Sequence, residues 1–586
     1  MTAYSPPLDD ARFLLQEVFN APFRWAQMPR TQALGMEDAM AVLEAGGAVC
    51  AGLVAPTNAA GDRAGCRLVK GAVQSPPGFP DAWATYAAGG WIGLGGDPAW
   101  GGQGLPQSVA VLFQEMLFAA NPSFALYSVL TSGVSVALAA HASGALRARY
   151  LPALYSGRWA GTMCLTESQA GTDLGLLRCQ ARPDGGRHRI QGEKIFITGG
   201  DHDLTENILH LVLARLPDAP PGNRGLSLFA VPRRRVNDDG SLGDDNGVRV
   251  DRIEEKMGIH GSPTCVLQFE DSLGDLVGEP HQGLAAMFTM MNYERLSIGL
   301  QGLGLAEAAY QSARAYARDR VQGRAASGSS TGPDPILVHG DVRHMLLTQK
   351  ASTQAGRALA VWTAEQLDLA HHHPDPAERG RAEALVALLT PVAKASLSDW
   401  GFANTVRAQQ VFGGHGYTRA WDLEQRVRDA RIAQIYEGTN GVQAMDLVGR
   451  KLVRDGGQLF AVYCAELESA LQMPPAPAVR PFHNALQESL ERLRRVTDLL
   501  LADAPGAPEL AGAVATDYLA LFALTTYSYL WLRMASASAS GETPLHREKL
   551  ATGRFFVDRV LPQGLGLAAS IVAGAGAVAE FPDDAF

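Results

Sequence analysis

The chain has 586 residues, of which 47% are hydrophobic and 19% charged, and its formal net charge is −10. That length exceeds one ordinary hydrophobic core, so several packed units are expected, and the composition excludes extensive disorder. The acidic balance argues against a nucleic-acid-binding protein, whose surface needs clustered lysine and arginine. Six cysteines without a C-x-x-C pair or metal-like spacing predict a reduced compartment without disulfides. Because the amino terminus carries no secretory signal, we expect a cytoplasmic protein, with peripheral membrane contact left open.

The predicted elements begin with a helical domain over residues 1–156. Apolar residues recur at three- and four-residue spacings through residues 11–19 and 108–142. A loop rich in glycine and proline, residues 93–106, interrupts them without the strand–G-x-G-x-x-G–helix context of a dinucleotide fold. Over residues 157–278, short runs rich in β-branched and aromatic residues are bounded by Gly, Pro or Asp. These runs predict a central antiparallel β domain rather than βαβ repeats.

Helical spacing returns over residues 279–455 and predicts a C-terminal four-helix bundle, broken by a polar loop at residues 325–335. The histidines at 371–373 lie in a Pro-Asp loop without a spaced Cys or carboxylate partner, so no metal site is expected. Residues 456–586 predict an additional helical domain. Its most apolar stretch, residues 518–532, is short for a bilayer span and is interpreted as a buried helix, so no integral membrane segment is expected. The predicted fold class is therefore α+β.

Three stretches carry residues suited to chemistry. In residues 163–175, MCLTESQAGTDLG, a strand ends in a polar turn. Its small residues would admit a flat ligand and its hydroxyls could donate to ring atoms, although a plain capped turn is an equal alternative. In residues 193–200, EKIFITGG, period-two alternation places Phe196 and Thr198 on one face, where they could wall a flat cofactor. An ordinary half-buried strand is the simpler interpretation of that pattern.

The third stretch, residues 410–443, contains the glycines Gly413 and Gly414, which would allow close approach to a nucleotide. It also contains IYEGTNG, in which the lone carboxylate Glu437 precedes a helix. Asn440 and Gln443 resemble a capping box that opens this helix, and the unpaired N–H groups at its start would suit a phosphate.

Together, and in this order, LTESQAGTD, KIFITGG and QVFGGHGYTRAWDLEQRVRDARIAQIYEGT resemble three motifs of the acyl-CoA dehydrogenase family, over roughly residues 90–450. The amino-terminal segment and the carboxy-terminal extension are similar to the larger bacterial branch that includes methylthiopropionyl-CoA dehydrogenases. The resemblance implies an FAD-dependent oxidoreductase that converts an acyl-CoA thioester to the trans-2-enoyl-CoA. It also implies an electron-transferring flavoprotein as the electron acceptor and a homodimer as the assembly.

By the same resemblance, Glu437 is the base that takes the α proton while flavin N5 accepts the β hydride. An apolar pocket would raise its pKa toward the working pH. Gly438 would give the thioester room, and the backbone N–H of the base would be an oxyanion donor. Asn292 and Arg295 match positions that touch the CoA arm and its pocket. Glu294 is the alternative base, because a minority of the family carries its base there; otherwise it would be a pocket wall or a solvated helix residue.

The positions that match flavin contacts come from several stretches. Leu165 and Thr166 would bond the ring. Phe196 replaces a tryptophan beside the ring, and Thr198 would approach N5. Arg320 matches an arginine that reaches the flavin pyrophosphate of a neighbouring subunit. The other matched positions are Gly171 and Thr172 near the phosphate or substrate end, Thr439 at the helix start, and Gln410, Gly413 and Gly414 at the adenosine across the subunit interface.

Two other outcomes stay open at this point. A flavin oxidase on the same scaffold would differ in oxygen access, which these residues do not reveal. A non-enzymatic, DNA-associated relative would need a basic surface, and the net charge of −10 argues against it.

Overall fold

The computed structural model describes residues 4–237, 239–326 and 331–586, so residues 327–330 of the predicted polar loop lie outside the described part. The chain divides into two compact units. The first comprises Met1–Glu44, Pro106–Ala119 and Ile298–Phe586, and the second comprises Ala45–Leu105 and Ala120–Ser297. Helices make up the first unit and the large sheet lies in the second, so the predicted α+β class is confirmed.

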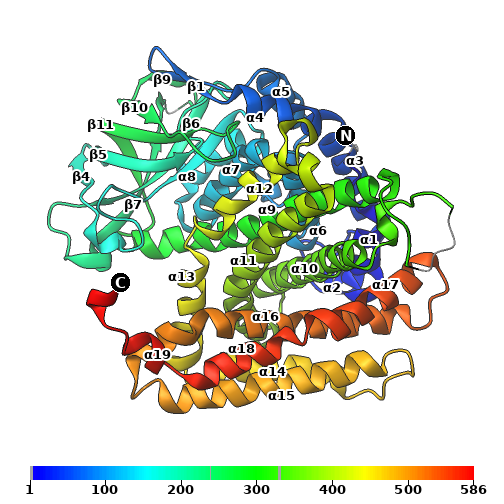
Figure 1. The fold of residues 1–586 in the computed structure, drawn as a ribbon. Coiled ribbons are helices and arrows are strands. Elements are labelled where there is room, and N and C mark those ends of the chain that lie inside the picture. The colour runs from blue at the N-terminus through cyan, green and yellow to red at the C-terminus, as the bar shows by residue number, and fades with distance from the viewer. Residues whose placement is uncertain (1–3, 238, 327–330) are drawn as a thin grey trace. The chain divides into compact units, whose positions relative to one another are not determined.

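The sheet of the second unit closes into a ring (Figure 1). Pairing runs β11–β5–β4–β6–β7 and returns to β11, with β10 beside β11 and β3 beside β6. The pairing is antiparallel except where β3 and β4 meet β6, so the prediction of a wholly antiparallel domain needs this correction. In the sequence, the β4–β5 hairpin comes between β3 and β6. The chain therefore enters β6 in the same direction as β3, and the two strands pair in parallel. The strands are β3 (Trp159–Cys164), β4 (Gln180–Asp184), β5 (Arg187–Thr198), β6 (Asn207–Arg215), β7 (Leu226–Pro232), β10 (Val248–Ile253) and β11 (Thr264–Val277).

Alternation along β6 explains why this strand is buried on both faces. Leu209, Leu211 and Leu213 join a core shared with helices α7 (Pro122–His141) and α8 (Gly144–Tyr155). Val212 and Ala214, on the opposite face of the strand, join a second core with residues of β4, β5, β7 and β11. A period of two therefore supplies two cores from one strand.

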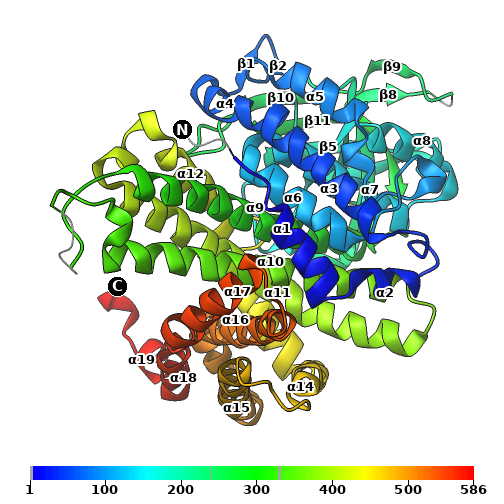
Figure 2. The ribbon, with the colours of Figure 1, turned by 90° about the vertical axis from the view of Figure 1, so that its right-hand side faces the viewer.

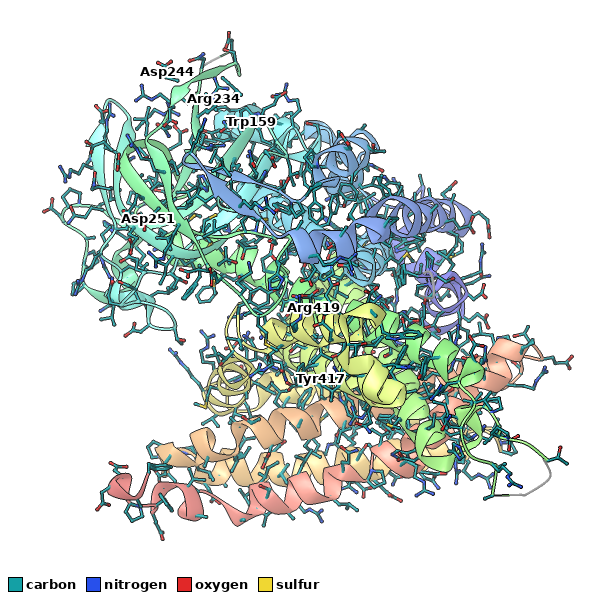
Figure 3. The ribbon with its side chains drawn as sticks, turned by 45° about the horizontal axis from the view of Figure 1, so that its top comes forward. Trp159, Arg234, Asp244, Asp251, Tyr417 and Arg419 are labelled. Carbon is teal, nitrogen blue, oxygen red and sulfur yellow. The ribbon has the colours of Figure 1, made fainter. Side chains whose placement is uncertain are left out.

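Helix α7 packs closely on β3, and small and hydroxyl side chains make this possible. A Cβ at Gly161 would lie 2.7 Å from Val134, so only glycine fits there without a shift. The Gly161 N–H donates to Thr131 Oγ1 at 3.0 Å. Two further helices and two small hairpins complete the second unit: α4 (Asn58–Ala64), α5 (Phe79–Ala88), β1 (Arg67–Val69) with β2 (Ala72–Gln74), and β8 (Arg234–Val236) with β9 (Leu242–Asp245). Figure 3 marks Trp159, Asp251, and the hairpin residues Arg234 and Asp244.

Long helices form the core of the first unit. α9 (Gly283–Asp319), α10 (Gly340–His372) and α11 (Pro376–Phe412) are its longest elements, and the boundary between the units falls within α9. α9 and α11 approach so closely that a Cβ at Gly401 would lie 2.6 Å from the backbone of Gly302. The remaining helices here are α1 (Leu8–Arg12), α2 (Ala21–Ala26), α3 (Met36–Val49), α6 (Gln107–Ala120), α12 (Leu423–Arg431), α13 (Asn440–Met445), α14 (Gln458–Leu471), α15 (Arg480–Asp503), α16 (Pro508–Ser538), α17 (Pro544–Phe555), α18 (Gln563–Ala573) and α19 (Gly576–Ala579).

The carboxy-terminal helices gather around α16, as the end-on view of Figure 2 shows. The predicted buried helix is confirmed within α16, because most of residues 518–532 are buried. Its length was underestimated, since α16 has 31 residues. Among the described residues, four stretches are long and apolar enough to cross a membrane by length and composition: Met36–Ala64, Pro122–His141, Pro508–Ser538 and Pro544–Ala573.

Candidate functional site

The turn after β3 is tied to the end of β5 in the second unit. The Ile195 N–H donates to the carbonyl of Thr166 at 2.9 Å. Lys194 Nζ donates to the carbonyl of Leu165 at 2.9 Å and forms an ion pair of 2.8 Å with Glu167 Oε1. The first two predicted stretches therefore meet at one place. Among the described residues, the N–H and hydroxyl of Thr166 donate to no other residue, so both remain available to a ligand.

Phe196 lies in a bulge of β5. Two residues, Ile195 and Phe196, stand opposite Val266 alone in β11, so the predicted period-two alternation breaks here. Phe196 has φ +59°, a conformation in which glycine is the usual bulge residue, and its side chain is 60% exposed. A left-handed aromatic residue with its ring in solvent is unfavourable on its own, which points to a ligand. Thr198 follows at the strand end, half-buried.

Gly171 and Thr172 lie apart from this contact, on the exposed loop that follows the turn. A Cβ at Gly171 would meet no atom within 4 Å, so close packing does not require glycine there. Asp173 accepts the N–H of Gly175 at 3.0 Å and caps a short helical turn. The predicted capping role of this loop is thus present, and its residues face open space.

Glu437 occupies a strained turn of the first unit. Its φ is +56°, and that of Gly438 is +79°. The hydroxyl of Tyr436 donates to Gln301 Oε1 on α9, and Gln443 Nε2 donates to the carbonyls of Glu437 at 3.3 Å and Gly438 at 3.1 Å. A left-handed glutamate costs about 1–2 kcal/mol, and such strain persists where function requires it and neighbours hold it. The turn therefore presents the half-buried Glu437 in one defined conformation.

The helix after this turn begins differently from the predicted capping box. The N-cap is Thr439, whose Oγ1 accepts the N–H of Val442 at 3.2 Å. Asn440 instead bonds α11: its Oδ1 accepts from Lys394 Nζ at 2.8 Å, and its amide donates to Asp399 at 2.7 Å. The prediction of an Asn440 cap was wrong because these long-range partners occupy its side chain.

Glu294 is buried in the second unit, with 1% of its surface exposed. The alternative of a solvated helix residue is therefore wrong. A Cβ at Gly133 of α7 would collide with Glu294 Oε1, so the glycine makes room for the carboxyl group. Arg295 is also buried and donates to Asn292 Oδ1 at 3.3 Å, while Asn292 is exposed. These adjacent residues form one polar group on the α9 segment of this unit.

A cavity of about 410 Å³ lies at the end of α9 in the first unit, and aromatic rings and charged groups line it. Tyr316 stacks on Phe412 with ring centroids 4.1 Å apart, and His415 stacks on Trp421 at 5.1 Å. The predicted Arg320 is among the lining residues. The lining does not include Gln410, Gly413 and Gly414, which are exposed near the α11 terminus; Figure 3 labels Tyr417 and Arg419 just beyond them.

Arg426 is a lining residue of this cavity that sequence reasoning missed. Its Nε and Nη1 are buried and have no hydrogen-bond partner among the described residues. Burial lowers the pKa of its guanidinium, and the carboxylates of Asp422 and Asp429 oppose that lowering. Unpaired buried donors beside Arg320 favour an anion. The only signal in the sequence was the group of arginines at 426, 428 and 431 on an amphipathic helix, which by itself is ordinary.

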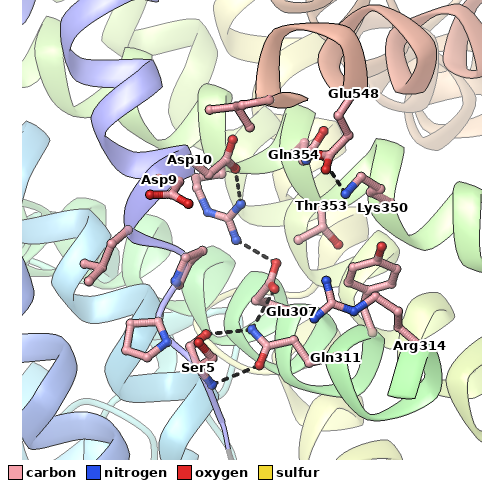
Figure 4. A pocket seen from close by; sticks show the side chains of 16 residues that line it. Ser5, Asp9, Asp10, Glu307, Gln311, Arg314, Lys350, Thr353, Gln354 and Glu548 are labelled. Carbon is pink, nitrogen blue, oxygen red and sulfur yellow. Dashed lines mark hydrogen bonds and ion pairs between the residues drawn. The ribbon is translucent and has the colours of Figure 1, made fainter. Parts of the chain in front are cut away.

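A second cavity, of about 430 Å³, lies where the amino-terminal segment meets α9, α10 and α17 (Figure 4). Beside it Arg357 is buried in an ion network. It bonds Glu307 at 2.8 Å, Glu115 at 2.9 Å and Asp10, which also pairs with Lys549. The network joins segments far apart in the chain. It contains no residue predicted for catalysis, and its evident role is to hold the first unit together.

Family models match four consecutive parts of the chain between residues 71 and 582. The N-terminal domain model of acyl-CoA dehydrogenases matches residues 71–158 and the middle domain model residues 162–272. The C-terminal domain model matches residues 281–452, and a model described as acetyl-CoA dehydrogenase C-terminal like matches residues 463–582. Over 570 residues the chain is 40% identical to 3-methylmercaptopropionyl-CoA dehydrogenase of Ruegeria pomeroyi, covering 95% of this chain and 96% of that protein.

The chain belongs to the acyl-CoA dehydrogenase family.

Another acyl-CoA dehydrogenase relative is butyryl-CoA dehydrogenase of Syntrophomonas wolfei, 34% identical over 579 residues and covering 94% of each chain. Among solved structures, an acyl-CoA dehydrogenase of Bacillus anthracis complexed with FAD is similar with a TM-score of 0.75. It is 19% identical and covers 94% of this chain and 90% of its own. The family resemblance inferred from the three motifs is thus confirmed, and the likeness of fold extends into the carboxy-terminal helices.

Proposed function

We propose that this protein is an FAD-dependent acyl-CoA dehydrogenase that oxidises the Cα–Cβ bond of an acyl-CoA thioester to the trans-2-enoyl-CoA. The observation that carries the proposal is the Glu437–Gly438 turn, in a chain whose full-length relatives are named acyl-CoA dehydrogenases. The bond from Tyr436 to Gln301 and the bond from Gln443 to the Glu437 carbonyl hold the strained backbone of the turn that carries the carboxylate. A base that must meet one carbon atom requires such preorganisation.

The residues of the second unit fit a flavin ring. Phe196 exposes an aromatic face, and the N–H and hydroxyl of Thr166 are available donors beside it. Thr198 adds a hydroxyl at the same strand end. A flat, partly polar heteroaromatic ring matches this combination of a stacking surface and donors. Leu165, Thr166, Phe196 and Thr198 are therefore proposed to hold the ring, which supplies the acceptor for the β hydride when it is bound.

The cavity at the end of α9 fits the phosphate-bearing part of the same cofactor. Arg320 and Arg426 supply positive charge, and the rings of Phe412 and Trp421 supply apolar surface. In the family this arginine position serves a neighbouring subunit, so we propose a homodimer whose cofactor sites use both chains. The exposed Gly413, Gly414 and Gln410 beside it would face the partner. Gly171 and Thr172, on an open loop, and Thr439, the N-cap of α13, are also proposed contacts.

In the proposed reaction Glu437 takes the α proton. Gly438 has no side chain, which would leave room for the thioester. A backbone N–H of the turn would donate to the thioester oxygen as negative charge develops at the α carbon. Asn292 and Arg295 are proposed for the CoA arm, with the exposed Asn292 the nearer to solvent. Glu294 is assigned to the pocket wall rather than to proton transfer, because its carboxyl group packs against Gly133.

Two of the full-length relatives are named for short acyl groups. One is named for a substrate with a thioether at the third carbon and another for a four-carbon acyl group. We therefore propose a short linear acyl-CoA, with or without a thioether sulfur, as substrate. An electron-transferring flavoprotein is the proposed acceptor, and a reaction with oxygen is the alternative outcome.

Anaerobic titration of the purified yellow protein with a panel of acyl-CoAs tests the proposal. The panel spans butyryl, 3-methylthiopropionyl, octanoyl and palmitoyl thioesters, and bleaching of the flavin absorbance is the signal. Glu437→Gln should retain the flavin and lose bleaching by about a thousandfold or more in rate, because the α proton has no acceptor. Glu294→Gln is the matched control and should still bleach. Bleaching by none of the thioesters contradicts the proposed function, and the reverse behaviour of the two variants contradicts only the assignment of the base.

A further inference from the structure

Lys194 is a fully buried cation on β5. A buried ammonium is unfavourable unless it is paired and hydrogen-bonded. Its Nζ satisfies both conditions, because it bonds the Leu165 carbonyl at 2.9 Å and Glu167 Oε1 at 2.8 Å. Both partners belong to the turn proposed to contact the flavin ring. The bonds explain how the Lys194 ammonium tolerates burial, but not why it lies beside this turn.

Glu167 connects the lysine to the rest of the turn. Its Oε2 accepts the N–H of Arg178 at 2.7 Å and the side-chain amide of Gln169 at 2.7 Å, and its Oε1 accepts the N–H of Cys179 at 3.0 Å. Burial alone would raise the pKa of this carboxyl group, but Lys194 and the two backbone N–H groups hold it below the ordinary value. Glu167 thus joins the turn to the chain that leads into β4.

Lys194 and its neighbour Ile195 on β5 each bind one of two successive carbonyls of the turn. Lys194 Nζ binds the Leu165 carbonyl, and the next residue, Ile195, donates its N–H to the Thr166 carbonyl at 2.9 Å. With both carbonyls turned toward β5, the N–H and hydroxyl of Thr166 are left for a ligand. Phe196, two residues after the lysine, is presented by the bulge that begins there. Lys194 therefore lies between the turn and the bulge, the two features proposed to contact the ring.

We propose that Lys194, through its ion pair with Glu167, is a positioning residue for the flavin ring. It does not contact the cofactor; its ammonium group holds the Leu165 carbonyl toward β5, next to the Ile195 N–H that holds the Thr166 carbonyl, and it lies directly before the Phe196 bulge. This inference rests on the proposed function, because it assumes that the second unit binds a flavin. It adds to that function a residue whose loss would alter how tightly, and in what surroundings, the ring is held.

The test compares Lys194→Met with a matched control on the same strand. Arg187 begins β5 and makes two bonds of 2.9 Å to Asp275, so Arg187→Met also removes an ion pair from this sheet. The two positions are seven residues apart, or roughly 20 Å along a strand. Both variants should lower the melting temperature of the deflavinated protein. Only Lys194→Met should weaken FAD binding, by about tenfold or more, and blur the vibrational structure of the flavin absorbance band.

The double variant Lys194→Met with Glu167→Gln separates positioning from stability. It removes the unpaired carboxylate that Lys194→Met alone would leave buried, and the glutamine oxygen still accepts a backbone N–H from Arg178 or Cys179, so stability is expected to recover. If Lys194 positions the ring, the double variant regains melting temperature without regaining FAD affinity. Recovery of both together, or a loss of affinity in Arg187→Met equal to that in Lys194→Met, overturns the proposal.

Two further results are decisive. If Lys194→Met does not fold, Glu167→Gln replaces it, because the glutamine keeps an acceptor for the lysine and removes the charge. FAD affinity equal to that of the unmodified protein in Glu167→Gln then overturns the proposal. If the unmodified protein itself binds no FAD, the proposed function fails, which is distinguishable because no variant is needed to observe it.

Discussion

Replacing Asp10 by asparagine removes one charge from the ion network that joins the amino-terminal segment to α10 and α17. Asp10 is buried and pairs with both Arg357 and Lys549. Asparagine keeps the shape of the side chain and some of its hydrogen bonds. Lys549, which is also buried, would lose its carboxylate partner. We expect the first unit to become less stable, with the loss concentrated at α1 and α17.

The magnitude follows from the pKa of Asp10. Burial by itself would raise this pKa, but Lys549 and Arg357 lower it from 3.8 to about 2. At about 1.4 kcal/mol for each tenfold change in the acid constant, the ionised form gains about 2.5 kcal/mol in the folded state. Because the folded pKa is the lower one, this stabilisation is present above about pH 4 and is lost as the pH falls toward 2. At about pH 3 roughly 1 kcal/mol of it is already lost.

Pulsed hydrogen exchange across a urea series, resolved on peptides from α1 and α17, measures the local free energy of unfolding. Asp10→Asn should lower it by about 2.5 kcal/mol at neutral pH, and the difference from the unmodified protein should shrink by about 1 kcal/mol at about pH 3. The control is Arg12→Gln, two residues after Asp10, which removes an exposed ion pair with Glu37. It should change stability by less than about 0.5 kcal/mol. A difference that does not depend on pH would refute the electrostatic account.

Three shorter predictions concern the candidate site. Gly438→Ala should lower the turnover rate at least about tenfold without unfolding the protein, because its Cβ would lie 2.7 Å from Gln443 Nε2 at a φ of +79°; steady-state kinetics and circular dichroism measure this. Gly133→Ala should lower the melting temperature by roughly 2–4 °C or more, because the new Cβ would collide with the Glu294 carboxyl group. Adding Glu294→Ala to that variant should restore the melting temperature, whereas adding Glu294→Gln, which keeps the size of the side chain, should not. Arg426→Leu should weaken FAD binding about tenfold while leaving the melting temperature equal or higher, because an unpaired buried guanidinium is removed; a parallel loss of stability would show that the arginine is structural.

Much of the fold was predictable because it depends on local periodicity. Short runs rich in β-branched and aromatic residues became β6 and β7, three- and four-residue spacings became α7 and α9, and the most apolar late stretch became part of α16. The Glu437 turn was also identifiable, since Gly438 and Thr439 are residues that tight turns and helix starts favour. These features depend on residues within one or two turns of each other, which a linear pattern contains.

Other parts of the site were not predictable from such patterns. The bulge at Phe196 exists because β11 offers one residue opposite two, and nothing in EKIFITGG indicates its partner. Asn440 had the spacing of a cap but bonds Lys394 and Asp399 on α11 instead. In each case a partner distant in the chain outcompeted the local interpretation.

The family, the order of helical and β regions and the identity of the carboxylate proposed as base all followed from the amino-acid sequence, because motifs of small, aromatic and acidic residues survive as linear patterns. The burial of Glu294 against Gly133 and the buried pair of Lys194 and Glu167 at the turn proposed to bind flavin became visible only in the folded chain. Burial and pairing are properties of residues brought together from distant segments, and the free energy of a charge depends on them more than on its sequence neighbours.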